Sequence, residues 1–351
     1  MKISVIILKS ELDRDHILWI EACKKNIEIG SYQIIDITKN DWLDKIKQLQ
    51  FDLILCRPPG ISTFFKTLYD ERIMILSSFC GYKIYPSLQE IYLYENKKLL
   101  KDWLVAKEIK HPKTFVSFDF NDVDEYIQIK NNYPIVAKTN IGASGNGVVV
   151  LKTIEEAKIY VKNVFGRGIK SKSGPKWLKG NLIKKIKKLI TNRKFISQRM
   201  KEYSMSRNEI QKDFVFFQEF IPHEFEWRCV IIGDSFFAHK KVAINNISSG
   251  KLIKDYNNIP IKLLDYLLEF SEKTRVNSVA LDLFESDGDY LVNEIQCFFG
   301  QSDPYQMLVN DKPGRYQFNG KEWVFEEGMF NTNQCYDLRL THAIKQLLKV
   351  I

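Results

Sequence analysis

The first ninety-five residues alternate between short apolar runs and segments with helical spacing, and no other feature of the sequence restricts the fold as strongly. We expect strands at Lys2–Leu8, Tyr32–Ile37 and Phe51–Cys56, with helices at Asp13–Ile29 and Asp41–Leu49 between them. Strands that alternate with helices at this interval are typical of a parallel, doubly wound sheet. The sequence therefore predicts an α/β protein whose residues 1–95 form a Rossmann-like domain.

The pattern changes after residue 95. A helix is expected over Asn96–Lys107, with Glu95 or Asn96 as its N-cap, and it ends before His111-Pro112 because the residue before a proline disfavours helix. Strands are then expected at Lys113–Phe118, Pro134–Lys138 and Val148–Leu151, and helices at Asp122–Lys130 and Thr153–Phe165. The change of pattern indicates that a second domain begins here.

The remaining residues, 216–351, are predicted to be antiparallel in character. Strands are expected at Phe214–Ile221, Glu226–Ile232, Phe236–Ala243, Val279–Phe284 and Tyr290–Ile295, and a helix at Ile261–Thr274. The last two strands should form a hairpin, because Asp287-Gly288 between them is a favoured two-residue turn.

The positive charge is concentrated in one segment. The chain has 52 Lys and Arg against 43 Asp and Glu, a net charge of +9, but residues 166–212 alone carry +13, so the rest carries about −4. Apolar residues recur there at helical spacing between lysines, at Trp177, Leu178, Leu182, Ile183, Ile186, Leu189 and Ile190. Such a helix suits an anionic membrane surface or a phosphorylated glycan precursor, and equally suits packing on its own domain. Nucleic acid is disfavoured, because few aromatic residues are interleaved for base stacking.

Cysteine usage and the N-terminus predict a cytoplasmic protein. The six cysteines are scattered without a Cys-x-x-Cys pair, as expected for reduced, mostly buried thiols. The apolar run at Met1–Leu8 is too short for a signal peptide, and no run approaches the roughly 20 apolar residues of a membrane span. The sequence leaves a monomer and a homodimer both open.

Three glycines, Gly142, Gly145 and Gly147, lie between two predicted strands. A Rossmann fingerprint or a P-loop needs a helix directly after the glycines, and here a strand follows. A glycine-rich loop between strands can bring backbone N–H groups over phosphate oxygens, and Lys138 can add a point charge to the same phosphates. The alternative is a flexible hairpin turn with a surface lysine.

The C-terminal hairpin carries two carboxylates and an amide. Folding it about Asp287-Gly288 puts Asp282 opposite residue 292, one diagonal step from Glu294, and alternation puts Glu294 and Gln296 on one face. Burying two carboxylates is costly unless a cation satisfies them, and oxygen ligands of this kind suit Mg²⁺ that bridges nucleotide phosphates.

The same carboxylates have a purely structural alternative. Arg228, Lys240 and Lys241 lie on neighbouring predicted strands, and they could pair with the carboxylates in a buried ion network. The sequence leaves the metal site and the ion network both open.

Taken in order, these motifs resemble the ATP-grasp superfamily, in particular its carboxylate–amine ligases of the ribosomal-protein-S6-modifying and peptide-ligating kind. The matching motifs are Asn96-Lys97, Pro134–Lys138, Gly142–Gly147, Phe217–Ile221, Glu226–Arg228, Leu281-Asp282 and Glu294–Gln296. The resemblance implies a domain before the grasp region at 1–95, a small or lid lobe at 96–215 with a basic insertion at 166–212, and a C-terminal lobe with the metal site at 216–351.

The resemblance also implies a role for each matching residue. By this resemblance, Lys97 and Lys138 would contact the phosphates. The loop that covers the triphosphate would contain Gly142, Ser144, Gly145 and Gly147. The hinge that binds adenine would be formed by Gln218, Glu219, Phe220 and Ile221, and Glu226 would contact the ribose. Arg228 and Lys240 or Lys241 would face the γ-phosphate, and Asp282, Glu294 and Gln296 would hold Mg²⁺. The family usually has Asn at the position of Gln296, and many relatives have Arg at the lysine pair.

The activity implied is ATP- and Mg²⁺-dependent joining of a carboxylate to an amine through an acyl phosphate. Phe165–Ile169, Asn246–Gly250 and Pro313–Tyr316 further resemble ATP-grasp proteins of bacterial surface-polysaccharide clusters, which implies a sugar acid or peptide as the carboxylate and an amino acid or other amine as its partner. Two alternatives remain open. One is a kinase that phosphorylates a hydroxyl group, and the other is a degenerate nucleotide-binding protein that docks on an anionic membrane through 166–212.

Overall fold

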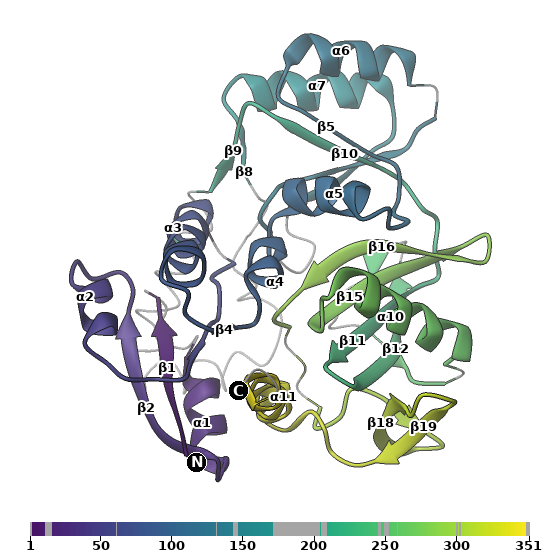
Figure 1. Cartoon of the computed structure of the whole chain (residues 1–351). Coiled ribbons are helices and arrows are strands. Elements are labelled where there is room, and N and C mark those ends of the chain that lie inside the picture. The colour runs from purple at the N-terminus through teal and green to yellow at the C-terminus, as the bar shows by residue number, and fades with distance from the viewer. Residues whose placement is uncertain are drawn as a thin grey trace, which may run out of the picture. The chain divides into compact units, whose positions relative to one another are not determined.

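The computed structural model describes residues 2–10, 16–60, 62–130, 132–142, 147–170, 204, 209–244, 247–248, 253–257, 259–299, 301 and 303–348 (Figure 1). The chain divides into two compact units. Unit 1 contains Met1–Pro58, Leu68–Pro112 and Ile221–Ile351, and unit 2 contains Pro59–Thr67 and Lys113–Phe220. No helix in the described part of the chain is long and apolar enough to cross a membrane.

The N-terminal part of unit 1 is the parallel, doubly wound sheet that the sequence predicts. Its strands are β1 (Ile3–Lys9), β2 (Ile29–Asp36), β3 (Leu53–Leu55) and β4 (Ile84–Tyr85), in the order β2-β1-β3-β4, and all pairs are parallel. Alternate β1 residues face different cores. Val5 and Ile7 pack in the cluster that contains Trp19 of α1 (Ile17–Lys25), whereas Ile6 packs with Trp42 of α2 (Trp42–Lys47). Helices therefore cover both faces of the sheet.

Several short helices follow β3. They are α3 (Thr63–Met74), a π-helical turn η1 (Ile75–Phe79), α4 (Leu88–Leu93) and α5 (Lys97–Ala106). A capping box starts α4, because the Ser87 side chain accepts from the Glu90 backbone N–H and the Glu90 carboxylate accepts from the Ser87 backbone N–H. Helix α5 is capped by the Asn96 side chain, as the sequence allows.

Unit 2 contains an antiparallel sheet with two helices on one face. The strands are β5 (Thr114–Ser117), β10 (Val215–Glu219), β6 (Ile135–Lys138) and β7 (Val148–Leu151), in that spatial order, and the helices are α6 (Phe120–Ile129) and α7 (Ile154–Phe165). Val123 and Val161 from the helices pack against Ala137 and Phe217 from the sheet. The predicted boundary at 215/216 falls inside β10, which pairs with β5 and β6 along its length.

The basic segment begins and ends in a small ribbon of unit 2. Strand β8 (Ile169–Lys170) pairs with β9 (Ile210–Gln211). The amphipathic helix expected over 177–190 lies outside the described residues.

The C-terminal part of unit 1 contains a sheet with nine strands among the described residues, and its strand pairs are antiparallel, as predicted. The path is β16 (Asp289–Gln296), β15 (Ser278–Ser286), β11 (Phe225–Ile232), β12 (Ser235–Ile244), β18 (Lys312–Phe318) and β17 (Leu308–Val309). Strands β13 (Ile247–Ser248) and β14 (Lys254–Asp255) pair with β12, and β19 (Trp323–Glu327) pairs with β18. The described residues end with a 3₁₀ turn η3 (Thr332–Cys335) and α11 (Tyr336–Leu348).

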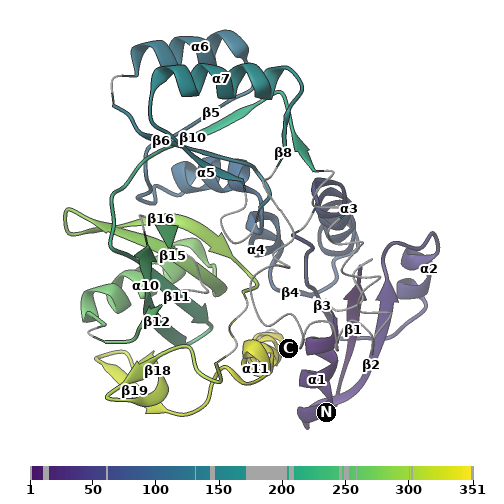
Figure 2. The same cartoon turned by 180° about the vertical axis from the view of Figure 1, so that it is seen from behind.

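One face of this sheet packs on α10 (Ile261–Thr274), whose bounds match the sequence prediction (Figure 2). Trp227 and Cys229 of β11 and Leu281 of β15 share a core with Leu263 and Leu267 of the helix. Side chains alternate between the two faces of a strand, so the residues between these apolar ones point away from α10.

Candidate active site

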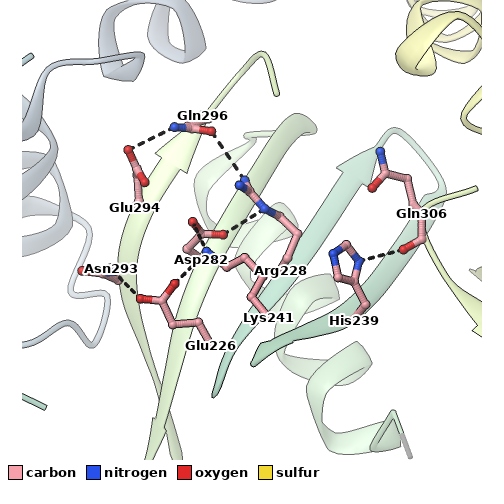
Figure 3. A network of polar contacts seen from close by, with 9 residues as sticks. All are labelled: Glu226, Arg228, His239, Lys241, Asp282, Asn293, Glu294, Gln296 and Gln306. Carbon is pink, nitrogen blue, oxygen red and sulfur yellow. Dashed lines mark hydrogen bonds and ion pairs between the residues drawn. The ribbon is translucent and has the colours of Figure 1, made fainter. Parts of the chain in front are cut away.

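The face of the sheet opposite α10 carries a group of charged and polar side chains (Figure 3). We call it the charged face, and it consists of Glu226, Arg228, His239, Lys241, Asp282, Asn293, Glu294 and Gln296. Farther along the strands the same face becomes apolar, with Val230 and Phe237 buried in a separate hydrophobic cluster. The polar groups are therefore confined to one end of the sheet.

A β-bulge brings the two acids of the hairpin directly opposite each other. The turn forms as predicted, with φ of 52° at Asp287 and 78° at Gly288. The predicted register is wrong, because Asp282 pairs with Glu294 and not with residue 292, which pairs with Leu283. The extra residue at the bulge is Asn293, and such an insertion shifts the register by one position.

Lys241 is the centre of a buried ion network. Its Nζ lies 2.6 Å from Oε2 of Glu226 and 2.7 Å from Oδ2 of Asp282. Burial alone would lower the pKa of Lys241, but the carboxylates of Asp282 and Glu226 outweigh it and raise that pKa. At neutral pH the lysine is therefore a cation held by two carboxylates.

Asp282 has a second cation beside it. Its Oδ1 lies 3.1 Å from Nε of Arg228 but accepts no hydrogen bond. Burial would raise the pKa of this carboxyl group, yet the charges of Arg228 and Lys241 lower it below its usual range. The structure thus contains the ion network that the sequence left open as an alternative. One buried carboxylate oxygen in this network, Oδ1 of Asp282, accepts no hydrogen bond.

Amide side chains link the remaining acids to the network. Gln296 donates to Oε1 of Glu294 at 3.0 Å, and its own Oε1 lies 3.5 Å from Nη1 of Arg228. Asn293 donates to Oε1 of Glu226 at 3.1 Å. Sequence reasoning missed Asn293, because its place on this face depends on the bulge; the only signal is two polar residues in succession within an otherwise alternating strand.

His239 is buried and neutral. Its Nδ1 lies 2.8 Å from the Gln306 carbonyl oxygen, which only accepts hydrogen bonds, so this nitrogen carries the proton. Burial lowers the pKa of His239 to about 3, and the nearby positive charges of Arg228, Lys254 and Lys241 add to the effect. The imidazole therefore contributes no charge to the face at neutral pH.

The two adjacent lysines of β12 point to opposite faces. Lys240 lies over aromatic rings, with Nζ 4.8 Å from the Phe225 centroid and 5.3 Å from that of Trp227. Its Nζ is also 3.9 Å from Oδ2 of Asp255. Of the two candidates, only Lys241 shares a face with Arg228.

Lys97, also in unit 1, is the first residue of α5. Its Nζ lies 3.9 Å from Oε2 of Glu95, a carboxylate whose side chain is 1% exposed. A buried carboxylate thus pairs with the lysine to which the resemblance assigns a phosphate contact.

The other predicted phosphate contacts belong to unit 2. Lys138 is the last residue of β6 and is buried. Gly147 has a φ of +82°, and a Cβ there would lie 1.9 Å from Oγ1 of Thr139, so the turn requires glycine. Gly142 is described, whereas Ser144 and Gly145 lie outside the described residues.

The predicted adenine hinge lies at the end of β10. Gln218 donates to the Thr114 hydroxyl at 3.3 Å, and Glu219 donates its backbone N–H to the Lys113 carbonyl at 2.8 Å. Phe220 and Ile221 follow the strand as irregular backbone. Their main-chain groups form none of the sheet pairings of β10.

Comparison with solved structures identifies the fold. D-alanyl-alanine synthetase A from Vibrio cholerae aligns over 99% of both chains with a TM-score of 0.56 and 12% identity. N5-carboxyaminoimidazole synthetase from Staphylococcus aureus complexed with ADP covers 98% of this chain and 78% of its own, with a TM-score of 0.54 and 12% identity. The chain has the ATP-grasp fold. The predicted fold class is confirmed.

Two further comparisons find proteins that are named as ligases. D-alanine–D-alanine ligase from Bacillus anthracis complexed with ATP covers 99% of this chain and 98% of its own, with a TM-score of 0.52 and 14% identity. Coenzyme γ-F420-2:α-L-glutamate ligase of Methanocaldococcus jannaschii is 28% identical over 124 residues, 34% of this chain, and the match spans 43% of that protein. No family model matches the sequence.

Proposed function

We propose that this protein is an ATP- and Mg²⁺-dependent carboxylate–amine ligase that releases ADP. The observation that carries the proposal is the charged face, where Arg228, Lys241, Asp282 and Glu294 are held together at one end of a sheet in an ATP-grasp fold. Proteins of this fold are named as D-alanine–D-alanine ligases and one is complexed with ATP, and the curated relative is named as a glutamate ligase.

In the proposed reaction, a carboxylate oxygen attacks the γ-phosphorus of ATP, the bond to the β,γ-bridging oxygen breaks, and ADP leaves with that electron pair. The amine then attacks the acyl carbon of the mixed anhydride, loses a proton and expels phosphate. Both steps need positioning and charge neutralisation, with no covalent protein nucleophile. Arg228 supplies a fixed cation for the transferring phosphoryl group, and Lys97 and Lys138 are proposed to bind the other phosphates.

Lys241 acts on this reaction through its neighbours. It is enclosed by Glu226 and Asp282, so its charge is already compensated. It helps to lower the pKa of Asp282 and holds both carboxylates in fixed positions. That makes it a positioning residue for Asp282.

The donor set of the hairpin fits one Mg²⁺ ion. Within the described residues no three His, Cys, Asp or Glu side chains cluster as a metal site by themselves, so an amide oxygen is needed as well. Asp282 offers an oxygen without a hydrogen bond, and Glu294 and Gln296 add a carboxylate and an amide oxygen on the same face. When bound, the ion would neutralise charge on the β- and γ-phosphates.

The remaining assignments belong to the same proposal. Gln218, Glu219, Phe220 and Ile221 bind adenine through main-chain groups, Glu226 contacts the ribose, and Gly142, Ser144, Gly145 and Gly147 cover the triphosphate. The substrates are a sugar acid or peptide carboxylate and an amino acid or other amine, as in surface-polysaccharide synthesis, in the cytoplasm. The basic segment at 166–212 is proposed to contact an anionic surface.

A second candidate is a nucleotide-binding protein without ligase activity. It is favoured by one observation, that two cations already flank Asp282 where a metal ligand is proposed.

Hydroxylamine distinguishes these candidates, because it traps an acyl phosphate as a stable hydroxamate. The protein is incubated with ATP, MgCl₂, hydroxylamine and separate acids, including D-glucuronate, D-galacturonate and L-glutamate, and both ADP and hydroxamate are measured. A ligase forms equal amounts of both with at least one acid, and Asp282→Asn lowers this rate at least tenfold. ADP without hydroxamate indicates a hydroxyl kinase, and ATP binding without turnover of any acid indicates the second candidate.

The adjacent lysines provide a matched pair of variants. Lys241→Met should lower the rate strongly, whereas Lys240→Met removes the same charge from the opposite face and should have a much smaller effect. Equal losses in both variants would contradict the role given to the charged face.

A further inference from the structure

Arg339 is a fully buried arginine whose hydrogen-bonding nitrogens have no acceptor. It lies in α11 with 0% of its surface exposed, and its Nε, Nη1 and Nη2 make no hydrogen bond. No described carboxylate lies within ion-pair distance of it. A guanidinium remains charged at every physiological pH, and burying a charge without a partner is costly. A native structure therefore rarely keeps such a group without a purpose.

Aromatic rings surround this guanidinium. Its central carbon lies 4.5 Å from the Phe299 centroid, 4.6 Å from that of Phe298 and 5.6 Å from that of Tyr336. Cation–π attraction offsets part of the cost of removing the charge from water. It supplies no acceptor for the five N–H groups, so the donors still lack partners.

Arg315 is a second arginine that lies over an aromatic ring, but its N–H groups have hydrogen-bond partners. It also lies over a ring, 4.4 Å from the Phe330 centroid, but its Nε and Nη2 bind the Glu326 carboxylate at 2.7 and 2.6 Å. Its Nη1 donates to the hydroxyl group of Ser235 at 2.7 Å. Unlike Arg315, Arg339 has no oxyanion that accepts hydrogen bonds from its N–H groups.

A second guanidinium, that of Arg57, lies against two of the rings that surround Arg339. Arg57 follows β3 at the carboxyl end of the parallel sheet, donates to the Tyr336 hydroxyl, and has its guanidinium 6.0 Å from the same ring. The nearest acid in sequence, Asp337, pairs with Lys25 at 3.2 Å. Ligands of open α/β sheets bind at the carboxyl ends of the strands, and Arg57 lies at such an end.

We propose that Arg339, with Arg57 against the same two rings, binds a small oxyanion, and that this anion is an anchoring group of a substrate and not the group that reacts. Phe298 follows Gln296 of the charged face by two residues, a distance of at most about 7 Å along the chain. A guanidinium matches a carboxylate or a phosphate through two parallel hydrogen bonds. The identity of the anion as a substrate group rests on the proposed ligase function, whereas the existence of the site does not.

The test is thermal unfolding of the full chain without nucleotide. Unfolding is measured in a chloride buffer and then with acetate, succinate, glutarate or inorganic phosphate at constant ionic strength, for the wild type, Arg339→Met and Arg315→Met. Methionine keeps much of the volume and removes the charge. The wild type should be stabilised saturably by at least one anion, with at least tenfold weaker apparent affinity in Arg339→Met and an unchanged affinity in Arg315→Met.

Without added anion, Arg339→Met should unfold at or above the wild-type temperature, and Arg315→Met below it, because only the second variant breaks an ion pair. A response to carboxylates identifies a carboxylate anchor, and a response to phosphate alone identifies a phosphate anchor. The proposal is overturned if no anion stabilises the wild type, if Arg339→Met responds as the wild type does, or if it unfolds well below the wild type without anion. Because no ATP is present, a negative ligase assay leaves this result unaffected.

Discussion

The neutral, buried His239 predicts a specific loss of stability in mild acid. Burial lowers its folded-state pKa to about 3, from an ordinary value of 6.5 in the unfolded chain. As the pH falls below 6.5, the unfolded chain binds a proton at this histidine that the folded protein does not bind. The stability that the neutral His239 contributes is therefore fully present above pH 6.5 and is lost as the pH falls toward 3. One proton changes the free energy of unfolding by up to about 1.4 kcal/mol per pH unit. At pH 6.5 the histidine is only half protonated in the unfolded chain. The free energy of unfolding therefore falls by about 1 kcal/mol between pH 6.5 and 5.5.

The variant His239→Asn isolates this contribution. Its amide can still donate to the Gln306 carbonyl oxygen, but it does not titrate. Urea unfolding is measured for both proteins at pH 6.5, 6.0 and 5.5, and the wild type should lose about 1 kcal/mol more than the variant over this range. Parallel pH dependences would refute the reasoning, as would an NMR titration in which the His239 Cε1 shift of the folded protein moves with a midpoint near pH 6.

Three further predictions concern Lys241, Gly147 and Lys138. Lys241→Met should cost about 3–5 kcal/mol of unfolding free energy, because it leaves two buried carboxylates without their common cation, and the triple variant with Glu226→Gln and Asp282→Asn should cost less than the single one. Gly147→Ala should lower the melting temperature because of its positive φ and the contact with Thr139, with partial recovery when Thr139 is also changed to alanine; full stability in the single variant would contradict the geometry. Lys138→Met should weaken MgADP binding at least tenfold by calorimetry if Lys138 contacts phosphate, and unchanged affinity would exclude that role.

The sequence predicted the elements better than the contacts between them. The parallel sheet was predictable because β1 and β3 are continuous apolar runs, as expected for strands buried on both faces. The bounds of α10 matched because Pro260 stands at its start and an apolar stripe covers its buried face. Helix α4 was overlooked although Ser87 and Glu90 form a recognisable capping box, since its six residues are too few to show a period.

Periodicity alone did not predict the orientation of the lysine pair. Periodicity assigns faces only where one face is apolar and the other polar. In β12 both faces are apolar before the lysines, because Phe236 and Ala238 pack in one core and Phe237 in another. Alternation alone then fixes that Lys240 and Lys241 point to opposite faces. The register of β11 and β12, in which Arg228 lies opposite His239, places Lys241 on the face of Arg228.

The net charge of the charged face determines whether this face would attract or repel a nucleotide with and without Mg²⁺. Glu226, Asp282 and Glu294 contribute three negative charges, Arg228 and Lys241 two positive ones, and His239 is neutral, so the face carries a net charge of −1. A net negative face repels a free triphosphate and attracts a divalent cation. Binding of one Mg²⁺ ion would reverse the sign to +1, and the face would then attract the phosphates that Arg228 and the ion would share. The ion pairs of Asp282 are thus compatible with the proposed metal site, because they limit the negative charge of the face to the amount that a single divalent cation reverses.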